Sequence, residues 1–136
     1  MIQPMEFSMR ICAIVFGLLF LITSSVSADN WPNWRGPTLN GVAPKGTYPV
    51  KWSATENVAW KIKLPGKGTS TPIVWRGQII LTSQEVGKNT TMALDRSGKT
   101  IWKMTAGGAG IKGKHRKASG SNPSPITDGK HIYVYF

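Results

Sequence analysis

A repeated pair of short apolar segments constrains the fold of this chain more than any other feature. Residues 71–73 (Thr-Pro-Ile) are followed by residues 79–81 (Ile-Ile-Leu). A related pair, residues 124–126 (Ser-Pro-Ile) and 132–134 (Ile-Tyr-Val), lies 53 residues further along. A repeat of about 40 to 55 residues with about four short strands is typical of a β-propeller blade. The alternative is two unrelated hairpins in a small sandwich.

The rest of the chain is typical of strands and turns. No stretch has apolar residues at helical spacing, so we expect little or no helix. Short β-branched and aromatic runs are separated instead by turn signals such as Pro65-Gly66, Arg76-Gly77 and Asp128-Gly129. The fold class predicted is therefore all-β. The expected strands cover residues 58–64, 70–75, 78–83, 90–94, 100–104, 124–127 and 131–136.

The turn after residue 94 has a clear physical basis. Asp95 opens it, and an Asp in that position accepts hydrogen bonds from backbone N–H groups about two residues on. Gly98 can adopt the left-handed conformation that closes such a loop as a bulge. Trp102 then returns on the next strand with a large flat face for a neighbouring sheet. A second similarity, residues 59–61 (Ala-Trp-Lys) with residues 101–103 (Ile-Trp-Lys), places Trp60 as the counterpart of Trp102.

Residues 93–102 resemble the A-x-D-x-x-[TS]-G-x-x-x-W repeat of PQQ-type β-propellers, the architecture of quinoprotein dehydrogenases and of an outer-membrane assembly scaffold. Residues 31–37 (Trp-Pro-Asn-Trp-Arg-Gly-Pro) and 115–129 resemble segments of exported bacterial proteins with such repeats. The resemblance implies that the Gly turn joins the third and fourth strands of a blade and that the Trp docks one blade on the next. It also implies a repeat signature, which comprises Trp60, Asp95, Gly98, Trp102, Asp128 and Gly129. Gly120 departs from the pattern, which has an aromatic residue there.

The resemblance also implies a domain organisation. Residues 58–136 would form a partial propeller, about the first blade and a half of about eight. Within it, residues 58–64 would be a ring-closing outer strand, residues 70–105 the first blade and residues 124–136 the start of a second. Residues 29–57 would be an extended N-terminal segment. We therefore expect the chain to be the N-terminal fragment of a larger propeller.

The first 28 residues have the pattern of a signal peptide. Residues 11–22 are an uninterrupted apolar run preceded by Arg10, and small residues precede a cleavage point after Ala28. Twelve apolar residues are fewer than the roughly 20 needed to cross a bilayer. The alternative is an anchor that stays uncleaved. We expect an exported protein, periplasmic or extracellular, with no stable membrane span after cleavage.

The charge is strongly basic, with 17 Lys and Arg against 6 Asp and Glu and a formal net charge of +11. The one dense basic cluster comprises Lys112, Lys114, His115, Arg116 and Lys117. It is either a polyanion-binding site, since clustered cations gain affinity by releasing counterions, or a solvated loop. The aromatic residues lie in predicted strands and do not interleave with the cluster, so we expect no nucleic acid partner.

Few residues suggest catalysis. Residues 108–115 approach a phosphate-binding loop, but His115 replaces the hydroxyl residue and no helix is predicted to follow. The one Cys, Cys12, lies in the expected signal peptide and excludes a disulfide framework or a Cys-based zinc cluster. Neither His115 nor His131 has an acidic neighbour at metal-ligand spacing. We predict no catalytic, cofactor-binding or metal-binding residue.

Three functions remain open. The first is an exported noncatalytic propeller segment that acts as a protein-interaction scaffold, with other cell-envelope proteins and the remaining blades as partners. The second is part of a PQQ-dependent dehydrogenase, which alone would require PQQ and calcium. The third is a basic polyanion-binding module. We favour the first, because blade architecture accounts for the Asp, Gly and Trp pattern.

Overall fold

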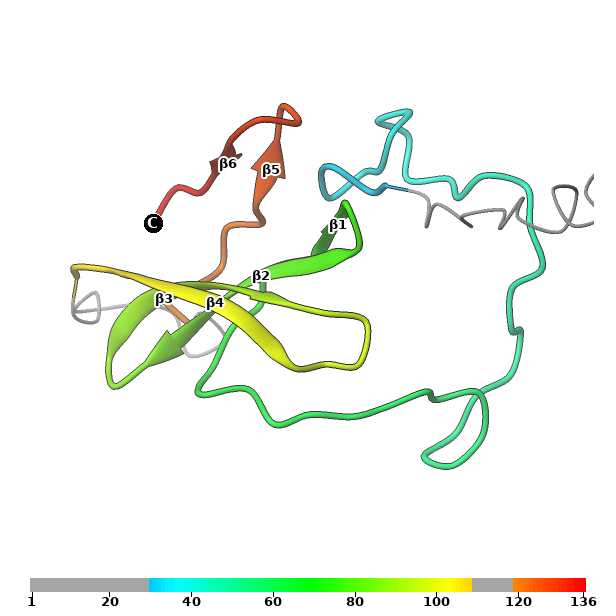
Figure 1. Ribbon diagram of the computed structural model, residues 1–136, viewed down its shortest axis with the longest axis horizontal. Coiled ribbons are helices and arrows are strands. Elements are labelled where there is room, and N and C mark those ends of the chain that lie inside the picture. Colours follow the sequence, from blue (N-terminus) through cyan, green and yellow to red (C-terminus); the bar gives the residue numbers. More distant parts are fainter. Residues whose placement is uncertain (1–29, 109–118) are drawn as a thin grey trace, which may run out of the picture.

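A computed structural model describes residues 30–108 and 119–136, and its described part is all-β, without a helix. One sheet has four antiparallel strands in the order β1-β2-β3-β4, and the other is the hairpin β5-β6 (Figure 1). The expected all-β class is confirmed. No helix capable of crossing a membrane occurs in the described ranges. The strands are β1 Ile73–Trp75, β2 Gln78–Glu85, β3 Lys88–Leu94, β4 Thr100–Ala106, β5 Ile126–Thr127 and β6 Ile132–Tyr133.

Two tight turns connect the first three strands. Arg76 and Gly77 join β1 to β2 with φ of 49° and 77°, a pair of positive values that matches the right-handed twist of a hairpin. Val86 and Gly87 join β2 to β3 in the same way, with φ of 50° and 74°. The sequence predicts the first turn and misses the second, because a β-branched residue rarely adopts positive φ. Strands β2 and β3 are therefore longer than expected.

The third hairpin contains a bulge beside the Asp95 turn. Ala93 is paired with Trp102 and Leu94 with Thr100, so Ile101 is the extra residue and the register shifts between Ala93 and Leu94. The bulge therefore lies on β4, just after the Gly98 turn. The sequence predicts that this loop closes as a bulge.

The sequence repeat is also a repeat of strand register. In the first hairpin Ile73 is paired with Ile80, and in the second Ile126 is paired with Tyr133. Each residue of the second pair lies 53 positions after its counterpart. The second hairpin is shorter, since β5 and β6 have two residues each. Equivalent residues in the two segments thus have equivalent backbone partners.

Both faces of the four-stranded sheet are packed. Adjacent residues of a strand point to opposite faces, so Ile80 and Leu81 belong to different clusters. One cluster comprises Ile73, Ile80 and Ala93, with Trp75, Trp102 and Ile132 packed against it. The other comprises Leu81, Met92 and Leu94, with Trp60, Leu64 and Ile79 packed against it. Ile132 of β6 therefore packs on one face, and Trp60 and Leu64 pack on the other.

Residues 58–64 differ from the sequence prediction. They were expected to form a strand, but the structure gives them no strand partner within its described ranges (Figure 1). The alternation is present only in part, because Trp60 and Leu64 are half-buried and Lys61 and Lys63 exposed, but Val58 and Ile62 are exposed as well. The segment thus has part of the side-chain pattern of a strand without the hydrogen bonds of one. A strand forms only when a second backbone supplies those bonds, which a propensity pattern does not reveal.

Candidate functional site

The carboxylate of Asp95 organises the turn between β3 and β4. Its Oδ1 accepts hydrogen bonds from the Ser97 N–H at 2.8 Å, the Ser97 hydroxyl at 2.6 Å and the Lys99 N–H at 3.0 Å. The Ser97 hydroxyl, followed by the Lys99 N–H, lowers the pKa of Asp95 below its ordinary value. All three contacts to Oδ1 are internal to the turn, so this Asp has the geometry of a turn residue.

Trp60 lies over this turn. A Cβ added to Gly98 would be 2.9 Å from the Trp60 ring and 3.0 Å from Ile62 Cγ2, and Gly98 has φ of 85°. The Trp60 indole N–H donates to the Arg96 carbonyl, which fixes the ring on the turn. A residue other than glycine at position 98 would displace the indole. The turn is therefore a docking site for a tryptophan from a distant part of the chain.

Trp102 has different surroundings from its sequence counterpart. It is half-buried on β4, packs against the cluster of Ile73, Ile80 and Ala93, and donates from its indole nitrogen to Gln78 Oε1 at 3.2 Å. Trp60 and Trp102 thus lie on opposite faces of the same sheet. No turn comparable to that of Gly98 contacts Trp102 in the described ranges.

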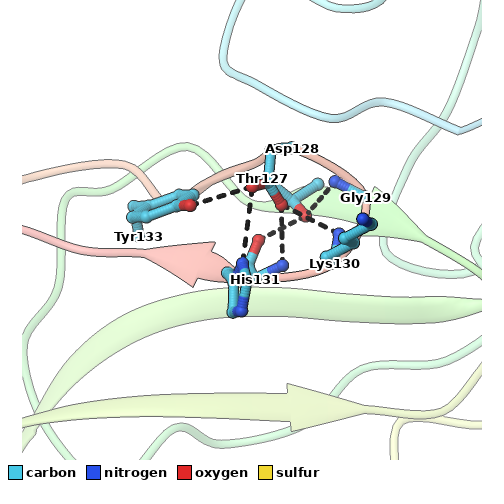
Figure 2. A network of polar contacts seen from close by, with 6 residues as sticks. All are labelled: Thr127, Asp128, Gly129, Lys130, His131 and Tyr133. Carbon is cyan, nitrogen blue, oxygen red and sulfur yellow. Dashed lines mark hydrogen bonds and ion pairs between the residues drawn. The ribbon is translucent and has the colours of Figure 1, made fainter.

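The loop between β5 and β6 is organised by a second Asp, as Figure 2 shows. Asp128 Oδ1 accepts from the backbone N–H groups of Lys130 at 2.8 Å and His131 at 2.7 Å, and its Oδ2 accepts from the Tyr133 hydroxyl at 2.8 Å. The His131 N–H, followed by that of Lys130 and then the Tyr133 hydroxyl, strongly lowers the pKa of Asp128. The same bond to Asp128 raises the pKa of Tyr133. Thr127 completes the loop, since its hydroxyl donates to the His131 carbonyl and accepts from the Gly129 N–H.

His131 lies close to this carboxylate, a proximity that was not predicted from the sequence. Their Nδ1 and Oδ2 atoms are 3.5 Å apart and both side chains are exposed, a pairing that the spacing of three residues could have indicated. The arrangement orients the imidazole, but the described residues contain no group of three His, Cys, Asp or Glu side chains able to hold a metal ion. With the carboxylate occupied by its own loop, the cluster has the geometry of a structural network.

The Asp128 loop also contacts the first hairpin. A Cβ added to Gly129 would be 3.1 Å from Trp75 Cζ2, and Gly129 has φ of 95°. The indole nitrogen of Trp75 is buried and has no hydrogen-bond partner within the described residues. Both glycines of the predicted repeat signature, Gly98 and Gly129, thus lie against a tryptophan ring.

A buried polar junction joins residues 119–125 to the four-stranded sheet. The Ser121 hydroxyl, which is fully buried, lies 2.9 Å from the Ser83 carbonyl and 3.0 Å from Asn89 Oδ1. The Thr82 hydroxyl reaches the Ser121 and Pro123 carbonyls, and Gly120 lies against the Gln84 side chain with φ of 70°. A side chain at position 120 would have to displace the end of the Gln84 side chain, and the positive φ would strain any residue other than glycine there. The serines here serve as links between segments.

The N-terminal motif forms a compact loop beside the first strand. Trp31 forms a bridge with Val74, and its ring lies 2.6 Å from where a Cβ of Gly36 would be. The buried Asn33 donates to the Gly36 carbonyl at 2.9 Å. The Pro32 carbonyl accepts from the Thr127 N–H at 3.0 Å, so this loop connects β1 with β5. Most of the motif therefore has a structural explanation.

Several sequence predictions fall outside the described ranges. The expected signal peptide, residues 1–28, is one, and the basic cluster of Lys112, Lys114, His115, Arg116 and Lys117 is another. The polyanion-binding prediction remains untested for that reason. Comparison with family models, curated proteins and solved structures finds no match to this chain.

Proposed function

We propose that the chain is an exported, noncatalytic segment of a PQQ-like β-propeller that acts as a scaffold for protein contacts in the cell envelope. In this proposal the four-stranded sheet is one blade, residues 58–64 are the outer strand of a preceding blade, and β5-β6 begins the following blade. The tryptophan docked on the Gly98 turn supports this assignment, because it attaches the preceding segment to the blade.

The observation that carries the proposal is the contact between equivalent residues of the two repeats. The Thr69 hydroxyl donates to Asn122 Oδ1 at 2.7 Å, and the Thr71 N–H donates to Ser124 Oγ at 2.8 Å. Each pair spans 53 positions, the offset of the repeat itself. The two copies of the motif lie side by side with matching residues in contact. A further copy could be placed against the second by the same rotation and translation that relates the first to the second. Units that stack in this way bury their faces against their neighbours.

Three of the four carboxylates in the described ranges support a scaffold over a dehydrogenase. Asp95 and Asp128 are acceptors within their own turns, and Glu85 is paired with the Lys103 ammonium group at 2.6 Å. A quinone-dependent enzyme requires carboxylates free to act as a base and to bind calcium. These three are used to hold turns and strands together, and the fourth, Glu56, is exposed on the N-terminal segment.

Titration of the purified protein with PQQ and calcium tests the proposal. A scaffold is expected to give no saturable change in PQQ absorbance or in tryptophan fluorescence, with or without calcium. Calcium alone serves as the control for non-specific cation effects. Saturable binding of PQQ at one molecule per chain would overturn the scaffold assignment and favour the dehydrogenase.

A further inference from the structure

The loop of residues 33–42 contains the one Asn-Gly pair of the sequence, Asn40-Gly41. Both residues are exposed, Gly41 has φ of 78°, and nothing lies within 4 Å of where a Cβ of Gly41 would be. The Gly41 nitrogen is therefore unhindered by a side chain of its own. Attack by this nitrogen on the side-chain amide of the preceding residue closes a five-membered ring, and the chain itself holds the two reacting groups near each other.

Three hydrogen bonds restrain the reacting groups while the loop is closed. The Gly41 N–H donates to the Arg35 carbonyl at 2.8 Å, so the proton that must leave the attacking nitrogen is held. Asn40 Oδ1 accepts from the Thr38 hydroxyl at 2.7 Å and from the Val42 N–H at 2.8 Å. The amide must release both donors before it can rotate. The order of the loop and the restraint on the Asn-Gly pair thus depend on the same contacts.

The closed loop is strained at Leu39. Its φ is 60°, a conformation that costs a residue with a Cβ about 1–2 kcal/mol. Its side chain is 63% exposed, so burial offsets little of this cost. Opening of the loop relieves the strain and releases the three hydrogen bonds together. Exposed segments of this kind open locally at a much lower free energy than that of global unfolding.

We propose that Asn40-Gly41 is a self-modification site, which the closed loop restrains and which reacts when residues 33–42 open. The Gly41 nitrogen gives its proton to solvent hydroxide and forms a bond to Asn40 Cγ. The carbonyl electron pair moves to Oδ1 and returns as the bond to Nδ2 breaks, and ammonia leaves with a proton taken from water. The product is a succinimide, which water opens to aspartate or isoaspartate. This inference does not depend on the scaffold function proposed above.

The isoaspartate product changes the loop permanently. It lengthens the backbone by one atom between residues 40 and 41, which displaces the Gly41 N–H from the Arg35 carbonyl. The loop adjoins the segment that connects β1 with β5 through Trp31 and Pro32. Modification therefore leaves an irreversible record of loop opening next to this connection.

Incubation of the full chain at neutral pH, followed by mass spectrometry of its digest, measures the rate of conversion. A synthetic peptide of residues 33–44 gives the rate for the open loop, and hydrogen exchange resolved at single amides gives the protection of Gly41. The test variant is Thr38→Val, which removes one donor to Oδ1 with little change in side-chain shape. The matched control is Thr55→Val, at an exposed threonine in another turn of the same segment.

The folded chain is expected to react more slowly than the peptide. The factor should equal the exchange protection of the Gly41 amide, because one opening event releases both. In Thr38→Val the conversion and the exchange should both accelerate about two- to ten-fold, the range expected for the loss of one net hydrogen bond. In Thr55→Val both rates should change by less than about two-fold.

Several outcomes would overturn the inference. Equal rates for the chain and the peptide, or an unprotected Gly41 amide, would show that the loop does not restrain the site. Slower conversion in Thr38→Val would show that the donors to Oδ1 activate the amide by stabilising the charge that develops there. Equal acceleration by both variants would attribute the effect to general destabilisation. The absence of conversion in the peptide would show that the pair is not reactive even when open.

Discussion

At the scale of single residues, glycine and aspartate have separate tasks in the two Asp turns. Asp95 and Asp128 supply acceptors for the backbone N–H groups of their own loops. Gly98 and Gly129 supply positive φ and a surface without a Cβ, against which a tryptophan ring lies. A turn that has both residues is at once a closed loop and a docking surface.

Replacement of Gly98 by Ala should destabilise the protein in two ways, through the backbone conformation of the turn and through the contact with Trp60. The backbone cost of an alanine at positive φ is about 1–2 kcal/mol. Contact with the Trp60 ring, 2.9 Å from the new Cβ, should add roughly 1–3 kcal/mol of overpacking. Gly87→Ala is the matched control, since Gly87 has φ of 74° and nothing within 4 Å of the added Cβ. Urea unfolding followed by tryptophan fluorescence measures both, and equal losses of stability would argue against docking on Gly98.

The pH dependence of the Asp128 loop follows from the direction of its pKa shift. Hydrogen bonds from His131, Lys130 and Tyr133 lower the pKa of Asp128 in the folded state. The loop is therefore stabilised above the unfolded pKa of about 3.9, and this contribution is lost as the pH falls through the folded value. A carboxyl carbon NMR titration should find Asp128 ionised well below pH 3.9. Titration at the ordinary value would show that the network of Figure 2 does not form in solution.

At the scale of elements, buried polar contacts join segments that are distant in the sequence. Residues 119–125 reach the sheet through Ser121 and Thr82, and the N-terminal loop reaches β5 through Pro32. Breaking such a contact is costly, because leaving a buried polar group without a partner costs more free energy than the intact hydrogen bond contributes. They fix how one element is placed on another more strictly than apolar packing does.

Replacement of Ser121 by Ala should destabilise the protein by about 1–3 kcal/mol, because the Ser83 carbonyl or the Asn89 amide then lacks a buried partner. Ser53→Ala is the control. The Ser53 hydroxyl accepts N–H groups of its own exposed turn, so its loss should cost less than about 0.5 kcal/mol. Chemical denaturation monitored by circular dichroism gives both values. A cost for Ser121→Ala as small as that of the control would mean that water replaces the junction.

At the scale of the whole molecule, the described residues expose much apolar surface. Trp34, Val50 and Trp52 are 61%, 89% and 69% exposed, and Ile101 and Met104 are exposed on the edge strand β4. Edge strands with apolar side chains tend to associate. A chain with these surfaces is expected to require neighbours.

We therefore predict that residues 29–136, expressed alone, aggregate or fold only partly. In the propeller segment proposed above, each unit would depend on contacts with adjacent units for its stability. Static light scattering and binding of a hydrophobic dye over a dilution series should report association and exposed apolar surface. A single cooperative thermal transition in a dilute monomeric sample, without dye binding, would contradict this prediction. The outcome of this experiment does not depend on whether the protein binds PQQ.

Local sequence predicted much of the strand pattern. The hairpins around Arg76-Gly77, Asp95–Lys99 and Asp128-Gly129 follow from turn chemistry within a few residues. The Val86-Gly87 turn could not be predicted, because strand pairing on both sides forces a valine into a conformation that its own preference opposes. The pairing of His131 with Asp128 was missed although it lies within a single loop.

The sequence by itself determined the all-β class and the positions of most turns, because alternation and turn preferences act between near neighbours. The tertiary structure alone decided that Trp60 lies on Gly98, that Ser121 lies in a buried junction, and that residues 58–64 lack a strand partner in the described ranges. The physical reason is that packing and backbone pairing depend on which distant segments share a surface. Residue order does not specify that until the chain is folded.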